Sequence, residues 1–160
     1  MSDAGDSGAQ QQGPQCALQR LYIKDLSFES PKSPEIFSSN WQPNINLQLN
    51  TSQRQYPDDL WEVVLQLTLT AKNERDTAFI IEIQQAGLFK ITGHDAEQLG
   101  RTLHIFCPDA LFPYARECVD SAVVRGSFPP LMLQAVNFDA LFAEARRRVA
   151  AGEDRPPIQH

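Results

Sequence analysis

The sequence contains no run of about 20 uninterrupted apolar residues, the length that a membrane-spanning helix needs. Residues 1–13 include neither lysine nor arginine and no apolar segment, so they do not resemble a secretory signal peptide. These absences predict a protein that does not insert into a membrane and stays in the compartment where it is made. We expect that compartment to be the cytoplasm.

Motifs for metal binding, nucleotide binding and nucleophilic catalysis are also missing. There is no CxxC pair, no HExxH, no glycine-rich phosphate loop and no GxSxG. The cysteines and histidines of the chain do not have the spacing of these motifs; they are Cys16, Cys107, Cys118, His94, His104 and His160. The acids of His94-Asp95-Ala96-Glu97 suit the start of a helix, whose dipole they stabilise. We expect no metal, no cofactor, no catalytic residue and reduced structural thiols, with Cys118 buried on a helix stripe.

Basic residues are scarce: 14 lysines and arginines stand against 20 acids, giving a net charge of −6 and an isoelectric point near 5.0. A surface of this sign repels phosphate backbones, so the sequence predicts no nucleic-acid partner. It favours basic or mixed-charge proteins instead, because opposite charges steer association.

With 160 residues, 42% of them apolar, the chain is long enough for one globular domain. Residues 1–15 are mostly small and polar, which predicts a disordered tail. Residues 150–160 carry Gly152 and the pair Pro156-Pro157, which predicts a flexible end. The expected domain therefore spans residues 16–149.

Strand-like segments precede helical ones. Four segments are rich in apolar residues, mostly in alternation with polar ones: 18–29, 45–50, 60–71 and 77–91. The short polar link 72–76 predicts an antiparallel hairpin. After Gly93 the pattern becomes helical, with one apolar stripe that comprises Leu111, Ala115, Cys118, Val119 and Ala122. Asn137 is suited to cap a last helix. This order predicts an α+β fold, a four-stranded antiparallel sheet with helices packed on one face.

Three patterns leave alternatives open. Residues 18–29 are apolar on both parities, which indicates coverage of both faces or a bulge. Gln84-Gln85-Ala86-Gly87 indicates either a bulge bending at Gly87 or a subunit interface that needs amide hydrogen bonds. The acids Asp25, Glu29 and Glu82 form either a solvated face or a docking patch for a basic partner.

The apolar side chains also exceed what one sheet and a helical layer can cover. Ile45, Leu47 and Leu49 share one strand face, and Phe37 and Trp41 lie in the loop before it. Exposed apolar area on this scale indicates self-association or an apolar ligand. Ordinary core burial of the strand residues is the alternative, because alternation alone does not separate core from groove.

Several blocks resemble the SecB family of bacterial export chaperones. They cover about residues 18–145 in order and with the family's spacing: Tyr22–Glu29, Trp41–Pro43, Glu82–Gln85 with Gly87 and Phe89, Cys107–Cys118, Arg125–Pro129 and Val136–Phe142.

The resemblance implies an ATP-independent chaperone, assembled as a homotetramer that is a dimer of dimers. Such a protein binds unfolded preproteins in apolar surface grooves. It delivers them to the motor ATPase SecA, whose basic, zinc-binding C-terminal tail docks on acidic outer sheet faces. Carried over by position, the SecA-binding residues are Asp25, Glu29, Ile80 and Glu82. The client-binding residues are Phe37, Trp41, Ile45, Leu47, Leu49 and Phe142, and the expected interface residues are Phe79, Ile81, Ile83 and Gln85.

Two rival functions and two departures from the family accompany this interpretation. One rival is a SecB-like chaperone devoted to one client, such as an antitoxin; the docking acids argue against it. The other is an enzyme, for which no catalytic group stands out. The departures are Arg146-Arg147-Arg148, where the family often has uncharged residues, and a C-terminal tail that is less acidic than is common.

Overall fold

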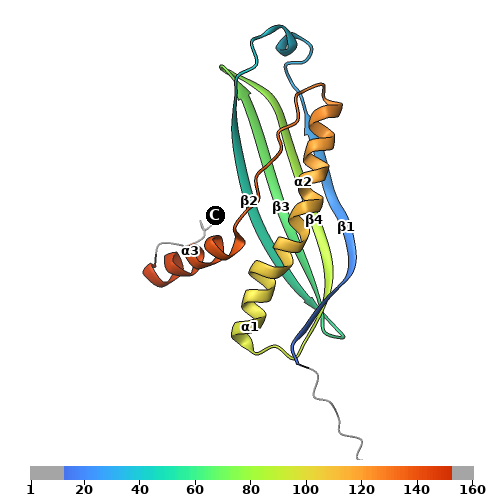
Figure 1. Cartoon of the computed structure of the whole chain (residues 1–160), viewed down its shortest axis with the longest axis vertical. Helices are drawn as coiled ribbons and strands as arrows, with labels where there is room; N and C mark the ends of the chain where they lie inside the picture. Colours follow the sequence, from blue (N-terminus) through green and yellow to red (C-terminus); the bar gives the residue numbers. More distant parts are fainter. Residues whose placement is uncertain (1–12, 153–160) are drawn as a thin grey trace, which may run out of the picture.

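Alternating apolar residues form four long strands in one antiparallel sheet of order β1-β4-β3-β2 (Figure 1). The computed structural model describes residues 13–152. The elements are β1 (Gln15–Glu29), the 3-10 helix η1 (Glu35–Ser38), β2 (Pro43–Tyr56), β3 (Leu60–Asn73), β4 (Asp76–Thr92), α1 (Ala96–Arg101), the π-helical turn η2 (Thr102–Phe106), α2 (Cys107–Arg125) and α3 (Phe138–Ala151). The predicted α+β fold is confirmed. The tails predicted to be disordered lie mostly outside the described residues, although Gln15 already belongs to β1 and α3 continues to Ala151.

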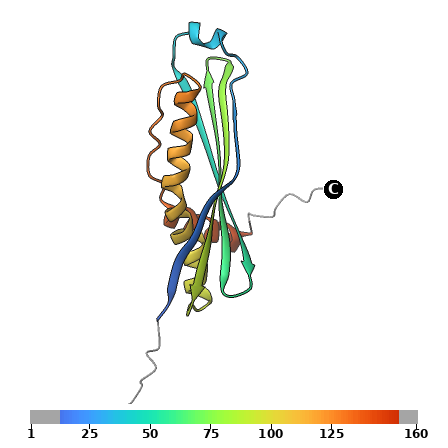
Figure 2. The same cartoon turned by 90° about the vertical axis from the view of Figure 1, so that its right-hand side faces the viewer.

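Helix α2 lies across one face of the sheet and leaves the other face without a helix (Figure 2). We call these the helix face and the open face. On the helix face, β3 and β4 present a row of side chains with no exposed surface: Val63, Leu65, Leu67, Leu69, Ala71, Phe79, Ile81 and Ile83. The period-2 alternation of these strands therefore separates a dry core from a wetter, more polar face.

Strand β1 contains the bulges that its mixed apolar pattern indicated. Its pairing with β4 passes from Leu18↔Phe89 to Arg20↔Leu88, and from Ile23↔Gln85 to Asp25↔Gln84. Each step inserts one extra residue in β1, which returns the next apolar residue to the helix face.

Of the two alternatives for Gln84–Gly87, the bulge is wrong, because β4 pairs with β3 without interruption there. Gly87 is instead required by a close approach. A Cβ atom at this position would lie 2.7 Å from Cε2 of Phe89 and 3.0 Å from Cδ2 of Leu111 on α2. Glycine lets α2 pack directly on the strand at this point.

Helix caps occur where the sequence places them. Asp95 accepts a hydrogen bond from the Gln98 backbone N–H at 2.8 Å, and Asn137 accepts one from the Ala140 N–H at 3.0 Å. Pro108 lies in the first turn of α2, directly after η2, and Pro113 lies further inside the helix, so each removes one backbone donor from a continuous helical segment.

The stripe predicted on α2 is confirmed for Leu111, Ala115 and Val119, which are fully buried. Cys118 is a correction: it is half-buried at the edge of the stripe. Cys107 in the first turn is the buried thiol of α2, and it shares a hydrogen bond with Cys16 of β1 that raises its pKa.

Residues 127–137, which we call the strap, run back along the helix face between α2 and β2 (Figure 1). The Met132 backbone N–H donates to the Asp120 carboxylate at 3.3 Å, and Leu131, Leu133 and Val136 pack against the core. The strap therefore covers part of the sheet that α2 does not reach, and it ends at α3, which points away from the sheet.

Candidate functional site

An aromatic cluster closes one end of the helix face. The ring centroids of Phe37 and Trp41 lie 5.4 and 5.3 Å from that of Phe128, which lies 4.9 Å from that of Phe79. These separations are those of favourable tilted aromatic pairs. Phe37 remains 48% exposed, so the cluster presents aromatic surface to solvent while Phe79 anchors it in the core.

A buried amide holds the loop that carries Trp41. Asn73, at the end of β3, donates to Oγ of Ser39 at 2.9 Å and to the backbone oxygen of Asn40 at 3.0 Å. Its Oδ1 accepts from the Gln42 backbone N–H at 2.8 Å. Asn73 is 2% exposed, and a buried amide is costly unless it is satisfied, so these bonds specify one loop conformation.

Three half-buried side chains of β2 continue from this cluster. Ile45, Leu47 and Leu49 pair with Ala71, Leu69 and Leu67 of β3, so all three lie on the helix face. They pack against the core yet keep some exposure, because β2 is an edge strand of the sheet. At about 3.3 Å per residue, the row from residue 45 to residue 49 is roughly 13 Å long.

The row ends at a groove between β2 and α3, which we call the α3 groove. Its volume is about 430 Å³, and its lining residues are Leu49, Asn50, Thr51, His104, Phe138, Leu141, Phe142, Glu144, Ala145 and Arg148. The structure therefore brings Leu49 and Phe142 together. Phe37 and Trp41 lie at the opposite end of the row, so the six client-binding candidates form a line along the β2 edge and not one pocket.

His104 is a groove residue that reasoning from the sequence missed. Its ring stacks on Phe142 with centroids 5.1 Å apart, and its Nδ1 lies 3.3 Å from Nε2 of Gln53. Burial lowers the pKa of His104, which favours the neutral form of the ring in this stack. Sequence spacing does not relate His104 to Phe142, because the contact depends on where the strap places α3 beside η2.

The four expected docking residues lie together on the open face. Strand pairing sets Asp25 opposite Gln84, Ser27 opposite Glu82 and Glu29 opposite Ile80. Their side chains share the face that no helix covers, with both acids of β1 beside Glu82 of β4. The arrangement can bind a basic partner segment, with Ile80 as an apolar contact.

A second polar group on the open face was also missed. Tyr22 donates to the Glu62 carboxylate at 2.5 Å, and Nζ of Lys24 lies 3.0 Å from the other Glu62 oxygen. The bond from Tyr22, reinforced by Lys24, lowers the pKa of Glu62, so the carboxylate is ionised at neutral pH. This group ties β1 to β3 across β4.

The expected interface residues occupy the protomer core. Phe79, Ile81 and Ile83 have no exposed surface. Gln85 is 3% exposed, and its amide donates to the Tyr22 carbonyl oxygen at 3.1 Å within the same chain. A contribution of these residues to assembly would therefore be indirect, through the sheet that they support.

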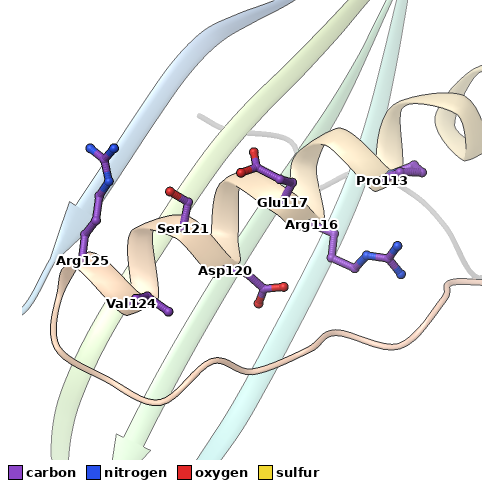
Figure 3. A pocket seen from close by; sticks show the side chains of 7 residues that line it. All are labelled: Pro113, Arg116, Glu117, Asp120, Ser121, Val124 and Arg125. Carbon is purple, nitrogen blue, oxygen red and sulfur yellow. The ribbon is translucent and has the colours of Figure 1, made fainter.

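Exposed apolar residues that could contact a further copy of the chain lie elsewhere, among them three residues of β1 and Tyr114 and Val124 of α2. Leu21, Ile23 and Leu26 of β1 point to the helix face beyond the reach of α2, with Ile23 48% exposed. The outward side of α2 forms a shallow hollow of mixed polarity, lined by Pro113, Arg116, Glu117, Asp120, Ser121, Val124 and Arg125 (Figure 3). These surfaces suit a further copy of the chain better than the buried row does.

Within residues 13–152, no group of three or more His, Cys, Asp or Glu side chains is placed to hold a metal ion. Nor is any helix of this part long and apolar enough to cross a membrane.

Comparison with known proteins agrees with this geometry. The family model "Preprotein translocase subunit SecB" matches residues 9–149. The protein-export protein SecB of Hahella chejuensis is 57% identical over 143 residues, 89% of this chain and 90% of that one. That of Ectopseudomonas mendocina is 56% identical over 153 residues, 95% of each chain.

A solved structure has the same fold. It is a Mycobacterium tuberculosis SecB-like chaperone in complex with a ChAD peptide from an antitoxin, with a TM-score of 0.64 at 19% identity, covering 76% of this chain and 91% of that chain. The extent and identity of the sequence matches decide the assignment: the chain belongs to the SecB family.

Proposed function

We propose that the chain is an ATP-independent chaperone of the cytoplasm that binds unfolded precursor proteins, keeps them competent for translocation and delivers them to SecA. The single observation that carries the proposal is the apolar line along the β2 edge, from Phe37 to Phe142. Apolar contact is non-directional and suits many sequences. Each large side chain that a client buries contributes about 1.5–3 kcal/mol, so several anchors offset the cost of ordering the client.

Assembly as a homotetramer, a dimer of dimers, belongs to the same proposal. The exposed apolar residues of β1 and the outward side of α2 support it. Four copies around one client would sum weak sites through effective concentration. The net charge of −6 favours solubility of such an assembly despite its grooves.

The purified chain is expected to suppress aggregation of a slow-folding preprotein diluted from denaturant, without nucleotide and at about one tetramer per client. Light scattering measures the suppression, and native mass measures the assembly. The double variant Phe37→Ser/Phe142→Ser should suppress less, because both changes remove apolar contact area. Phe106→Ser, at an exposed residue of η2 off the line, is the matched control. Equal activity of both variants, or no suppression by the natural chain, contradicts the proposal.

Glu82→Arg tests delivery to SecA. Replacing an attractive charge by a repulsive one on the open face should weaken SecA binding by about ten-fold, while client holding is unchanged. Glu97→Arg, a charge reversal on α1, serves as control. Titration of labelled SecA tail peptide measures both. Unchanged affinity of the Glu82 variant would rule out the docking assignment and leave the chaperone activity standing.

A further inference from the structure

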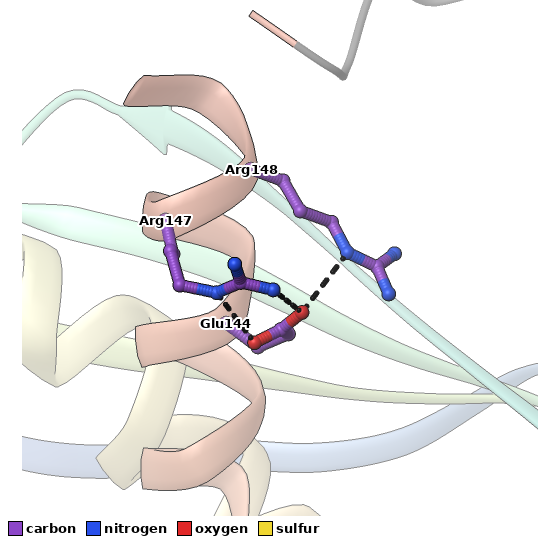
Figure 4. Close-up of polar contacts among 3 residues, drawn as sticks. All are labelled: Glu144, Arg147 and Arg148. Carbon is purple, nitrogen blue, oxygen red and sulfur yellow. Dashed lines mark hydrogen bonds and ion pairs between the residues drawn. The ribbon is translucent and has the colours of Figure 1, made fainter. Parts of the chain in front are cut away.

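Helix α3 carries a local excess of positive charge in an acidic chain. Arg146, Arg147 and Arg148 follow one another, and Glu144 is the carboxylate bound to two of them (Figure 4). Arg147 contacts both Glu144 oxygens, at 2.7 and 3.1 Å, and Nε of Arg148 lies 3.3 Å from one of them. One carboxylate thus serves two guanidinium groups.

The third arginine is held by an aromatic ring. The guanidinium carbon of Arg146 lies 5.4 Å from the centroid of the Phe142 ring, a cation–π distance. Asp139, the other acid of α3, is occupied by Arg101 at 3.6 Å. Glu144 contributes one negative charge and the three arginines contribute three positive ones. This turn of α3 therefore has a net charge of +2.

Part of this charge lies at the α3 groove: Arg148 is the arginine that lines it, and Arg146 lies against the lining ring of Phe142. Glu144 and Arg148 line it together with apolar Leu49, Leu141 and Phe142. An apolar side chain that enters the groove would place its neighbours in the client chain beside the arginines. The groove therefore combines an apolar anchor site with a paired Glu144 and Arg148 at its edge, next to a turn of α3 that carries net positive charge.

We propose that the α3 groove selects client segments in which apolar or aromatic residues are flanked by aspartate or glutamate. This inference rests on the proposed chaperone function and adds to it the class of segment that this groove prefers. Elsewhere the acidic surface repels such segments, and the arginines offset that repulsion locally. Apolar burial supplies most of the affinity, and the charges decide which segments bind best.

The expected effect on client affinity is limited by the exposure of the arginine side chains. The side chains of Arg147 and Arg148 are 67% and 54% exposed, so solvent weakens their ion pairs with a client. Exposed pairs of this kind change affinity by about three- to ten-fold for two charges at low salt. At 0.1 M salt the screening length is about 10 Å, so the preference should shrink as salt rises.

Two labelled peptides test the proposal, and both carry the same Leu/Phe core. One has three acidic residues on each side and the other has three lysines. Fluorescence anisotropy measures their affinities for the full chain and for Arg147→Gln/Arg148→Gln. The double variant should lose about five-fold in affinity for the acidic peptide and little for the basic one. Arg20→Gln/Arg75→Gln, which removes the same charge away from α3, should change neither affinity selectively.

Each outcome of this experiment either supports the proposed selection of acidic segments or rules it out. A loss of equal size for both peptides, or no loss for the acidic one, overturns the charge selection while the chaperone proposal stands. Failure of the natural chain to bind either peptide, together with failure to hold a denatured preprotein, overturns both. If the double variant binds both peptides normally but loses binding to vesicles of anionic phospholipid, the arginines serve a membrane surface and the inference is wrong.

Discussion

Replacing Phe79 by alanine is expected to lower the free energy of unfolding by about 3–5 kcal/mol. Phe79 has no exposed surface and contacts the aromatic rings of Phe28, Trp41 and Phe128, with centroids 4.9–6.4 Å away. Its truncation leaves a cavity that the sheet and the helix layer cannot close, because both are held by long ladders of hydrogen bonds. The loop with Trp41 would also lose its support.

Urea unfolding followed by tryptophan fluorescence measures this change at fixed protein concentration. Met132→Ala, at a strap residue that is 77% exposed, is the control and should change stability by less than about 0.5 kcal/mol. The experiment also separates the two roles considered for Phe79. A core role destabilises at every protein concentration, whereas a direct interface role would shift the proposed tetramer to smaller species without unfolding the protomer. The second result would contradict its burial.

Replacing Gly87 by valine should lower the free energy of unfolding by about 1–3 kcal/mol. Even its Cβ would approach Phe89, Leu111 and Leu18 to 2.7–3.1 Å, and the two methyl groups need further space beneath α2. The strand propensity that valine adds is smaller than this overpacking cost. Gly87→Ala should lie between the natural chain and the valine variant, because the Phe89 ring edge can move.

Ala17→Val provides the matched control, since Ala17 is an exposed residue of β1 opposite Lys90. The same urea titration measures both variants. A valine variant as stable as the natural chain would mean that α2 does not pack on β4 at this point, and the close approach described above would be wrong.

The fold was predictable where the signal is local. Period-2 alternation located β2, β3 and β4, the short link at residues 72–76 predicted the hairpin, and Asp95 and Asn137 marked helix starts. Each signal depends on residues within a few positions of one another, as a strand period or a helix cap does. The resemblance also named the acids that are expected to dock SecA, and the strand pairing of the structure places them on one face.

What the sequence did not predict depends on packing between distant segments. Cys118 lies at the edge of its stripe because α2 rests on β4 at one angle, which the periodicity of one helix does not specify. His104 joins the α3 groove because the strap places α3 beside η2. Gly87 indicated a bulge, yet the bulges lie in the neighbouring strand β1, where they change which side chains reach the helix face.

By itself, the sequence determined the strands, the helix caps, the acidic surface and the family, since these depend on composition, local periodicity and contiguous motifs. Only the tertiary structure decided which apolar residues stay accessible. Phe79, Ile81 and Ile83 are sealed by the helix layer and the aromatic cluster, whereas Leu49 and Phe142 meet in a groove that Arg148 also lines. The reason is physical: exposure depends on which segment covers a side chain, and here the covering segments, α2, the strap and α3, lie far along the chain from the strands that they cover.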